Sequence, residues 1–389
     1  MKKLLFALCA LVLCLSGKAN DGVYYTSGNQ LIPINETEIS VKKEVLDITR
    51  QDDKMRIHVY YEFYNPGEEK TLLVGFEAMP PGGDFGLSEE EYLKLTGHPN
   101  IYDFTVMVNG QPVKYQVSHV ERDENYVQNG KIKALTKQRE KELGEELDYS
   151  MTIPYLFVYH FNATFKKGLN IVEHTYTFEK SEFVGVEYSL DYVLTAANRW
   201  ANHQIDDFTM NLHMGERCSF DIPATFFKGE GGWTINGIGR KNMDKQYDNP
   251  LLRCHVQEGS VTFHQKNFHP KGELHVEQTF YIEQDEKNGF DNCEQYYHHI
   301  FKKAYPTTMM YRIFNPQDME CKPASADMKR IMRNLPFAVR GYVFKTKMIQ
   351  DYYESTDWYV ANPDYVSDMK DFTEDEQEWV GLWTEPKKE

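Results

Sequence analysis

The stretch M-R-I-H-V-Y-Y-E-F-Y at residues 55–64 decides the fold class. Apolar or aromatic residues stand at every second position from Ile57 to Phe63, and most of the positions between them are polar. Because successive side chains of a strand point to opposite faces, this spacing predicts a half-buried strand. Asn65-Pro66-Gly67 follows with turn chemistry, and the alternation resumes from Leu72 to Phe76. We therefore expect the two runs to pair as a hairpin.

Further alternating runs continue to about residue 280. Asn109-Gly110, the dipeptide that most strongly favours a two-residue hairpin turn, separates two of them. The later runs cover residues 172–178, 188–194, 208–214 and 274–280. Since no regular βαβ rhythm interrupts them, the sequence predicts a mainly β chain built as an antiparallel β-sandwich. Its expected extent is residues 20–285, as one sandwich or as two in tandem at about 20–165 and 166–285.

The first nineteen residues have the pattern of a secretory signal peptide. Two lysines at residues 2–3 precede an apolar run over residues 4–15, and small residues lead to Ala19. We expect cleavage after Ala19 and export to the periplasm or the extracellular space. The alternative is lipidation of Cys14, although the leucine before it is larger than a lipobox accepts. No later stretch is long and apolar enough to span a bilayer, so the sequence predicts no transmembrane segment.

The charge balance is acidic. The chain has 43 basic and 59 acidic side chains, and its first nineteen residues carry three lysines and no acid. The predicted mature chain therefore keeps 40 basic against 59 acidic side chains, a net charge of −19. Such a surface repels polyphosphates, which argues against nucleic acid as a partner.

Four cysteines lie outside the predicted signal segment, an even number that suits a compartment where disulfides form. Four cysteines allow three pairings. We expect Cys218 to pair with Cys254 inside the β region and Cys293 to pair with Cys321 after it, because each pair is close in sequence. The chain has no Cys-x-x-Cys or Cys-x-x-His spacing, so no metal site is predicted.

The spacing of apolar residues changes from alternation to helical periodicity near residue 285, and residues 286–389 predict a small all-α domain. Apolar residues at helical spacing indicate one helix over about 291–304 and a second between Ser325 and Leu335. A third candidate covers Lys347–Glu354. Thr373-x-x-Glu376 is a capping box that predicts the start of a last short helix.

Residues 333–344, R-N-L-P-F-A-V-R-G-Y-V-F, together with Tyr352-Tyr353 and Trp358-Tyr359, resemble the YARHG domain, a small extracellular bacterial module. The segment 371–377 is similar to the start of the family's closing helix, so the resemblance covers about residues 320–382. Ala338 and Gly341 match the motif that names the family, whereas Phe337, Val339 and Arg340 replace its Tyr, Arg and His. The family has no established activity for the resemblance to imply.

The amino-terminal part also resembles uncharacterised bacterial secreted proteins built from β-sandwich units. The segments that carry this resemblance are common strand and turn patterns, such as residues 61–65 and 104–110. The resemblance therefore concerns architecture alone.

One polar and aromatic cluster is a candidate binding site. Positive charge concentrates beside aromatic rings in a small part of the helical region, which suits an anionic or sugar ligand through ion pairs and stacking. Its members are Arg333, Arg340, Tyr342, Lys345, Trp358 and Tyr359. The alternative reading is that these aromatic rings form the core of the module and that the arginines bridge its loops.

The sequence contains no GxSxG, HExxH, Walker or Rossmann pattern, so no catalytic residue and no cofactor are predicted. We expect an exported, non-catalytic binding or structural protein of the cell envelope or the medium. Its candidate partners are glycan, peptidoglycan or another exported protein. The alternative is a cell-wall or glycan hydrolase with an unrecognised site in the β region.

Overall fold

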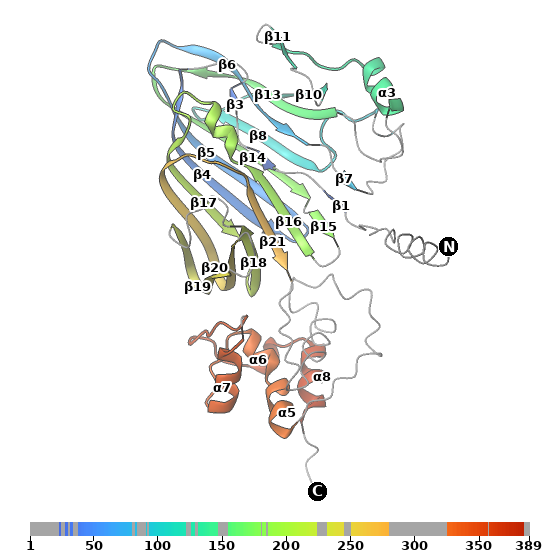
Figure 1. The fold of residues 1–389 in the computed structure, drawn as a ribbon, viewed down its shortest axis with the longest axis vertical. Coiled ribbons are helices and arrows are strands. Elements are labelled where there is room, and N and C mark those ends of the chain that lie inside the picture. Colours follow the sequence, from blue (N-terminus) through green and yellow to red (C-terminus); the bar gives the residue numbers. More distant parts are fainter. Residues whose placement is uncertain are drawn as a thin grey trace, which may run out of the picture.

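A β body and a smaller helical module make up the protein in the computed structural model (Figure 1). The structure describes residues 23–24, 28–29, 32–33, 38–79, 82–83, 91, 93–121, 126–128, 131–146, 155–179, 181–183, 186–223, 232–244, 250–279, 325–356 and 358–384. The predicted signal segment, the predicted helix at about 291–304, Cys293 and Cys321 lie outside these residues. No helix among the described residues is long and apolar enough to cross a membrane.

The first layer of the β body is built around three long strands. In it β5 pairs with β4 on one side and with β14 on the other, and β4 continues the layer through β17 and β20. The strands in order are β9 (Gln111–Pro112), β8 (Ile101–Val108), β14 (Gly168–Glu179), β5 (Lys54–Asn65), β4 (Ser40–Gln51), β17 (Ile205–His213), β20 (Leu251–Phe268) and β19 (Trp233–Asp244).

The second layer has two parts. One is a four-stranded sheet of β10 (Gln116–Glu121), β13 (Tyr155–Phe165), β6 (Lys70–Ala78) and β3 (Ile32–Pro33). The other joins the first layer through β20 and contains β18 (Cys218–Pro223), β21 (Leu274–Thr279), β16 (Val186–Val193) and β15 (Ser181–Phe183). Short strands β1 (Val23–Tyr24), β2 (Gly28–Asn29) and β7 (Gly82–Gly83) lie at this edge, and β11 (Val127–Gln128), β12 (Lys131–Ile132), α3 (Lys137–Glu146) and η1 (Thr195–Arg199) complete the body.

Aromatic side chains hold the two layers together. Phe76 of the second layer lies 5.5 Å from Phe104 and 5.4 Å from Tyr176 of the first, measured between ring centroids. Tyr61 and Phe63, which the alternation in residues 55–64 placed on the buried face, are at most 1% exposed. Most buried apolar residues from Ile39 to Val276 form one contiguous cluster, which is the main core of the β body, and Val120, Leu156 and Val158 of β10 and β13 form a smaller one. The predicted β-sandwich is confirmed.

The predicted pairing of the first two strands is wrong. Residues 55–64 form β5 as expected, but β6 belongs to the other layer and pairs with β13 and β3. Asn65 explains the crossing, because its buried side-chain amide donates to the carbonyl oxygens of Phe165 (3.0 Å) and Glu68 (2.9 Å) and accepts from the Gly67 N–H. These bonds fix an arch between the layers in place of a hairpin.

The sheet is not wholly antiparallel either. β17 runs parallel to β4, and β2 runs parallel to β16. The Asn109-Gly110 turn does form, with both residues at positive φ (50° and 74°) as a type I′ turn requires, but only Gln111 and Pro112 pair with β8. The chain then crosses to the second layer as β10.

The helical module contains α5 (Ala326–Arg333), α6 (Leu335–Val339), α7 (Lys347–Glu354), η5 (Met369–Asp371) and α8 (Glu374–Leu382). The predicted helix after Ser325 and the predicted capping box at Thr373 are both confirmed. The Ser325 side chain accepts from the Met328 N–H (3.2 Å), and Thr373 with Glu376 closes a capping box at α8. Trp379 is fully buried and donates from its ring N–H to the Met332 carbonyl oxygen (2.7 Å), which joins α8 to α5.

Candidate functional site

A cleft of about 480 Å³ opens at the edge of the β body where the chain crosses between the two layers. Residues 94–99 form one wall, and the start of β8 from Ile101 to Phe104 forms another. Tyr115 and Val117, at the crossing into β10, close the cleft together with Tyr159 of β13. The cleft therefore lies between the edge strands of the two sheets.

An aromatic platform forms the floor of this cleft. Tyr115 is 40% exposed and lies 4.6 Å from Phe104 and 6.1 Å from Tyr159, ring centroid to ring centroid. Its ring is nearly parallel to that of Tyr159, and both neighbours are buried. A tyrosine held in this way offers a rigid apolar face with a polar tip, which suits a ligand that has both C–H faces and hydroxyl groups.

His98 organises the loop above the platform. Its Nδ1 accepts from the Asn100 N–H (3.0 Å), so Nε2 carries the proton and donates to the Met79 carbonyl oxygen (2.9 Å). Burial lowers the pKa of His98 to about 3. The imidazole is therefore neutral at ordinary pH, and its two hydrogen bonds hold the loop.

Tyr159 contributes a hydrogen-bonding group to the cleft. Its hydroxyl oxygen accepts from the His98 N–H (3.1 Å), which leaves the hydroxyl proton without a protein acceptor among the described residues. Burial raises the pKa of Tyr159 to about 12, so the phenol keeps that proton. Gly97 lies against this oxygen, where a Cβ would come within 3.3 Å of it.

A bulge in β8 places Asp103 at the rim. The register between β8 and β14 shifts between Thr175 and Thr177, and Asp103 takes a left-handed conformation with φ 52°. Bulges redirect a side chain at the edge of a sheet, and positive φ is uncommon outside glycine. The exposed Asp103 and Lys94 give the cleft a carboxylate and an ammonium group beside its aromatic floor.

Sequence reasoning missed this cleft. The alternation after Asn109-Gly110 places Val113, Tyr115 and Val117 on one face of a run, but nothing in it indicates that the run leaves its hairpin partner. The bulge at Asp103 has no sequence signal of its own. The one usable signal was an aromatic residue close to a turn at a strand edge.

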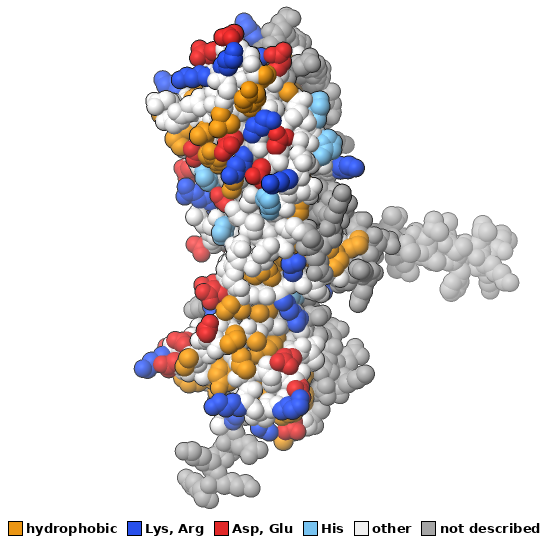
Figure 2. All heavy atoms as spheres, turned by 90° about the vertical axis from the view of Figure 1, so that its left-hand side faces the viewer, with side chains coloured by type: hydrophobic (Ala, Val, Ile, Leu, Met, Phe, Trp, Pro, Cys, Tyr) orange, Lys and Arg blue, Asp and Glu red, His pale blue; other side chains and the backbone are white. Residues whose placement is uncertain are grey.

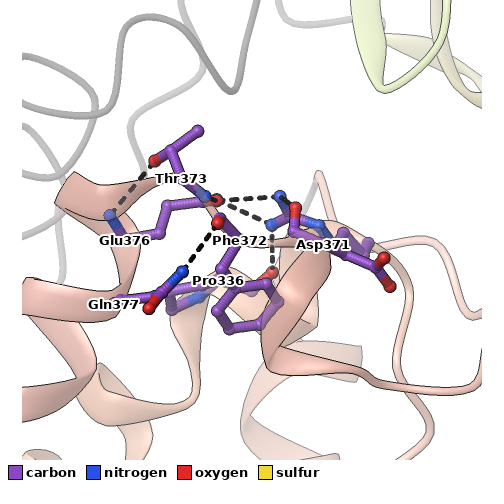
Figure 3. A network of polar contacts seen from close by, with 7 residues as sticks. Pro336, Asp371, Phe372, Thr373, Glu376 and Gln377 are labelled. Atoms are coloured by element: carbon purple, nitrogen blue, oxygen red, sulfur yellow. Dashed lines mark hydrogen bonds and ion pairs between the residues drawn. The ribbon is translucent and has the colours of Figure 1, made fainter.

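The predicted binding cluster of the helical module does not form one surface. Arg340 is buried, and its guanidinium makes a bidentate ion pair with Glu376 at 2.7 and 2.8 Å. It also donates to the carbonyl oxygens of Pro336 and Asp371 and lies 4.6 Å from the centroid of the Phe372 ring. Figure 3 shows this network around Glu376 and Asp371. Arg340 bridges the loops of the module, so it is not available to a ligand there.

Tyr359 is likewise part of the core. It is 3% exposed, and its hydroxyl donates to the Tyr342 carbonyl oxygen (2.8 Å). Tyr342 and Trp358 are half-buried against other rings of the module, Arg333 is half-buried at the end of α5, and Lys345 is exposed. Arg340 and Tyr359 thus belong to the small core and its loops, and the binding role of the six side chains stays a prediction.

The predicted disulfide between Cys218 and Cys254 is not formed. Both cysteines are buried thiols, the Cys218 thiol donates to the Gly215 carbonyl oxygen (3.2 Å), and burial raises the pKa of Cys254 to about 12. In the pairing of β18 with β20, Cys218 lies opposite Val256 and Cys254 lies opposite Phe220, so the two are diagonal neighbours. Such neighbours have Cα atoms about 7–8 Å apart, which exceeds the span of a disulfide. The predicted Cys293–Cys321 pair lies outside the described residues.

Comparison with known families identifies the helical module. The family model of the YARHG domain matches residues 309–385, which include α5 to α8 and the Arg340–Glu376 pair. The carboxy-terminal module is a YARHG domain. The resemblance expected from residues 333–344 is therefore confirmed, although Arg340 stands where the naming motif has His. In the YARHG domain of this chain, that position is structural.

The amino-terminal part matches a second family model, described as a domain of unknown function (DUF4424), over residues 19–125. This match contains most of the residues that line the cleft. No curated protein matches the sequence. A crystal structure from Legionella pneumophila, described as that of a candidate nutrient-binding protein, is similar with a TM-score of 0.46 and 16% identity, over 94% of this chain and 100% of the other.

Proposed function

We propose that this chain is an exported, non-catalytic protein that binds a carbohydrate in the cleft of the β body. The observation that carries the proposal is the half-exposed Tyr115 ring, supported from behind by Phe104 and Tyr159. The face of an aromatic ring is electron-rich, so it attracts the weakly positive C–H groups of a sugar ring. Asp103, Lys94 and the Tyr159 hydroxyl can then satisfy sugar hydroxyl groups at the rim.

The acid–base properties of the cleft favour binding over hydrolysis. Glycoside hydrolysis generally needs two carboxyl groups about 5–10 Å apart, one on each side of the scissile bond. Asp103 is the single carboxylate among the described residues that line the cleft. His98 and Tyr159 both stay neutral near pH 7, because burial lowers the pKa of the first to about 3 and raises that of the second to about 12.

Export of the protein and cleavage of its signal segment form part of the same proposal. The amino-terminal pattern supports cleavage after Ala19, and YARHG domains occur in exported proteins. Amino-terminal sequencing of the protein recovered from the medium or the periplasm is expected to begin at Asn20. A lipid-modified amino terminus at Cys14 would instead support the tethered alternative.

A carbohydrate array tests the binding function. The purified mature protein is applied to immobilised glycans and peptidoglycan fragments, and the same ligands are analysed by mass spectrometry for cleavage. We expect retention of at least one glycan without turnover, and loss of that retention in Tyr115→Ala. Tyr64→Ala is a matched control, because Tyr64 is 43% exposed on β5 and does not line the cleft.

Three results would contradict the proposal. Cleaved products would favour the alternative of a glycan hydrolase. Absence of binding to every ligand on the array would favour a protein partner. Equal retention by Tyr115→Ala and Tyr64→Ala would place binding elsewhere on the chain.

A further inference from the structure

A second cavity, of about 230 Å³, lies between the β body and the YARHG domain. On the body side it is lined by the turn that precedes β18, with Glu216 and Arg217, and by Glu258 in the middle of β20. Asn362, Tyr365 and Asp371 line it from the YARHG domain. Near this junction the Arg240 guanidinium donates to the Thr356 carbonyl oxygen (2.7 Å), which ties the two parts together.

Two hydrogen-bond donors in the cavity walls have no acceptor in the described part of the chain. The Arg217 Nε and the Tyr365 hydroxyl are buried atoms without a hydrogen-bond partner among the described residues. A buried donor that is left without an acceptor destabilises the fold. Arg217 also has a left-handed backbone with φ 51°, and its N–H donates to the Gln257 carbonyl oxygen (3.1 Å). The turn thus places beside the cavity a guanidinium whose Nε has no acceptor among the described residues, and an anionic ligand group would stabilise it.

Negative charge surrounds these donors. Glu216, Glu258 and Asp371 line the same cavity with exposed carboxylates. Arg340 also reaches this cavity, but its guanidinium is committed to Glu376. Figure 2 shows acidic and basic side chains together where the β body meets the helical module. The cavity can therefore accept a positive group as well as a negative one.

We propose that this cavity binds a small zwitterion, either a free amino acid or a dipeptide. The ligand carboxylate accepts from Arg217 and from the Tyr365 hydroxyl, and the ligand ammonium lies among Glu216, Glu258 and Asp371. The volume agrees with this class, because pockets for drug-sized ligands measure about 300–1,000 Å³ and this one is smaller. The ligand would also join the YARHG domain to the β body, since each contributes part of the site.

Isothermal titration calorimetry of the full mature chain tests this proposal. The probes are the common amino acids and alanyl-alanine, together with N-acetyl-alanyl-alanine and alanyl-alanine amide, which each lack one charge. We expect saturable binding of at least one zwitterion and binding weaker by about tenfold or more when either charge is removed. Arg217→Gln and Tyr365→Phe are each expected to weaken binding by a similar factor.

The controls separate this site from the carbohydrate cleft. Arg56→Gln removes an exposed arginine of β5 that lines neither cavity, and it is expected to bind as the parent does. Tyr115→Ala should also keep zwitterion binding, so failure of one site leaves the other testable. Absence of saturable binding to every probe would overturn the proposal, as would unchanged affinity in both Arg217→Gln and Tyr365→Phe. Equal affinity for the uncharged derivatives would overturn the zwitterion assignment.

Discussion

Replacing His174 with phenylalanine should make the β body markedly less sensitive to acid. His174 lies in β14 at 1% exposure, and neither ring nitrogen has a hydrogen-bond partner within the part of the chain that the structure describes. Its ring stacks on Tyr176 (5.9 Å) and Tyr61 (5.8 Å) in the aromatic core between the layers. Burial, and to a smaller extent the nearby His58, lower the pKa of His174 to about 3.

The sign of the pH effect follows from the difference between folded and unfolded states. In the unfolded chain histidine has its ordinary pKa of about 6.5, so between that value and about 3 the unfolded state binds the extra proton. The stability associated with the neutral ring is complete above the unfolded pKa and is lost as the pH falls toward the folded one. At pH 5 the loss from His174 alone is about 2 kcal/mol, given about 1.4 kcal/mol for each pKa unit.

Urea unfolding followed by tryptophan fluorescence measures this effect. Between pH 7.5 and pH 5 the His174→Phe variant should lose about 2 kcal/mol less free energy of unfolding than the parent does. Acid sensitivity will remain in part, because burial also lowers the pKa of His98 and His255 to about 3. His213→Gln, which removes an exposed histidine of β17, is the control and should behave as the parent does. If the free energy of unfolding falls by the same amount between pH 7.5 and pH 5 in His174→Phe and in the parent, the claim that His174 is buried in its neutral form is refuted.

Three further substitutions test the packing of the two parts. Arg340→Ala removes the cation that pairs with the buried Glu376 carboxylate and should destabilise the YARHG domain by about 3–5 kcal/mol. Hydrogen exchange should become faster in residues 335–384 and stay unchanged in residues 38–279. If residues 335–384 exchange at the same rate in the variant as in the parent, the role of the pair is contradicted. Gly75→Ala places a Cβ against the carbonyl oxygen of Tyr159 across the β6–β13 pairing. We expect the free energy of unfolding, measured in urea, to fall by about 1–3 kcal/mol. An unchanged value would show that the two strands can move apart at little cost. Thr373→Ala removes the cap of α8 and should cost about 1 kcal/mol by the same measurement, whereas Thr373→Ser should cost little.

Local sequence signals predicted the elements of this fold more successfully than their partners. The alternation in residues 55–64 and the capping box at Thr373 both describe what the structure contains, because each depends on neighbours within a few residues. The partner of β6 could not be read in this way. Asn65-Pro66-Gly67 is turn chemistry for a hairpin and for an arch alike, and the bond from Asn65 to Phe165 that selects the arch joins residues 100 positions apart.

The same limit applies to the candidate sites. Arg340 was predicted to bind a ligand because it is a cation among aromatic residues. Its partner, the buried Glu376, is 36 positions away, so the local sequence does not indicate the ion pair. The carbohydrate cleft needs β8 of one sheet to lie beside the β10–β13 side of the other, and it needs a β-bulge that no sequence pattern indicates. The short sequence separation of Cys218 and Cys254 did not indicate whether they form a disulfide, because the register of β18 and β20 makes them diagonal neighbours.

Hydrogen exchange with and without a retained glycan tests the central claim, that the cleft of the β body is the binding site, most directly. The account predicts slower exchange at backbone amides of residues 93–104 and 115–117 in the presence of the glycan, and no such change in Tyr115→Ala. Protection confined to residues 325–384 would contradict it and would assign the glycan to the YARHG domain.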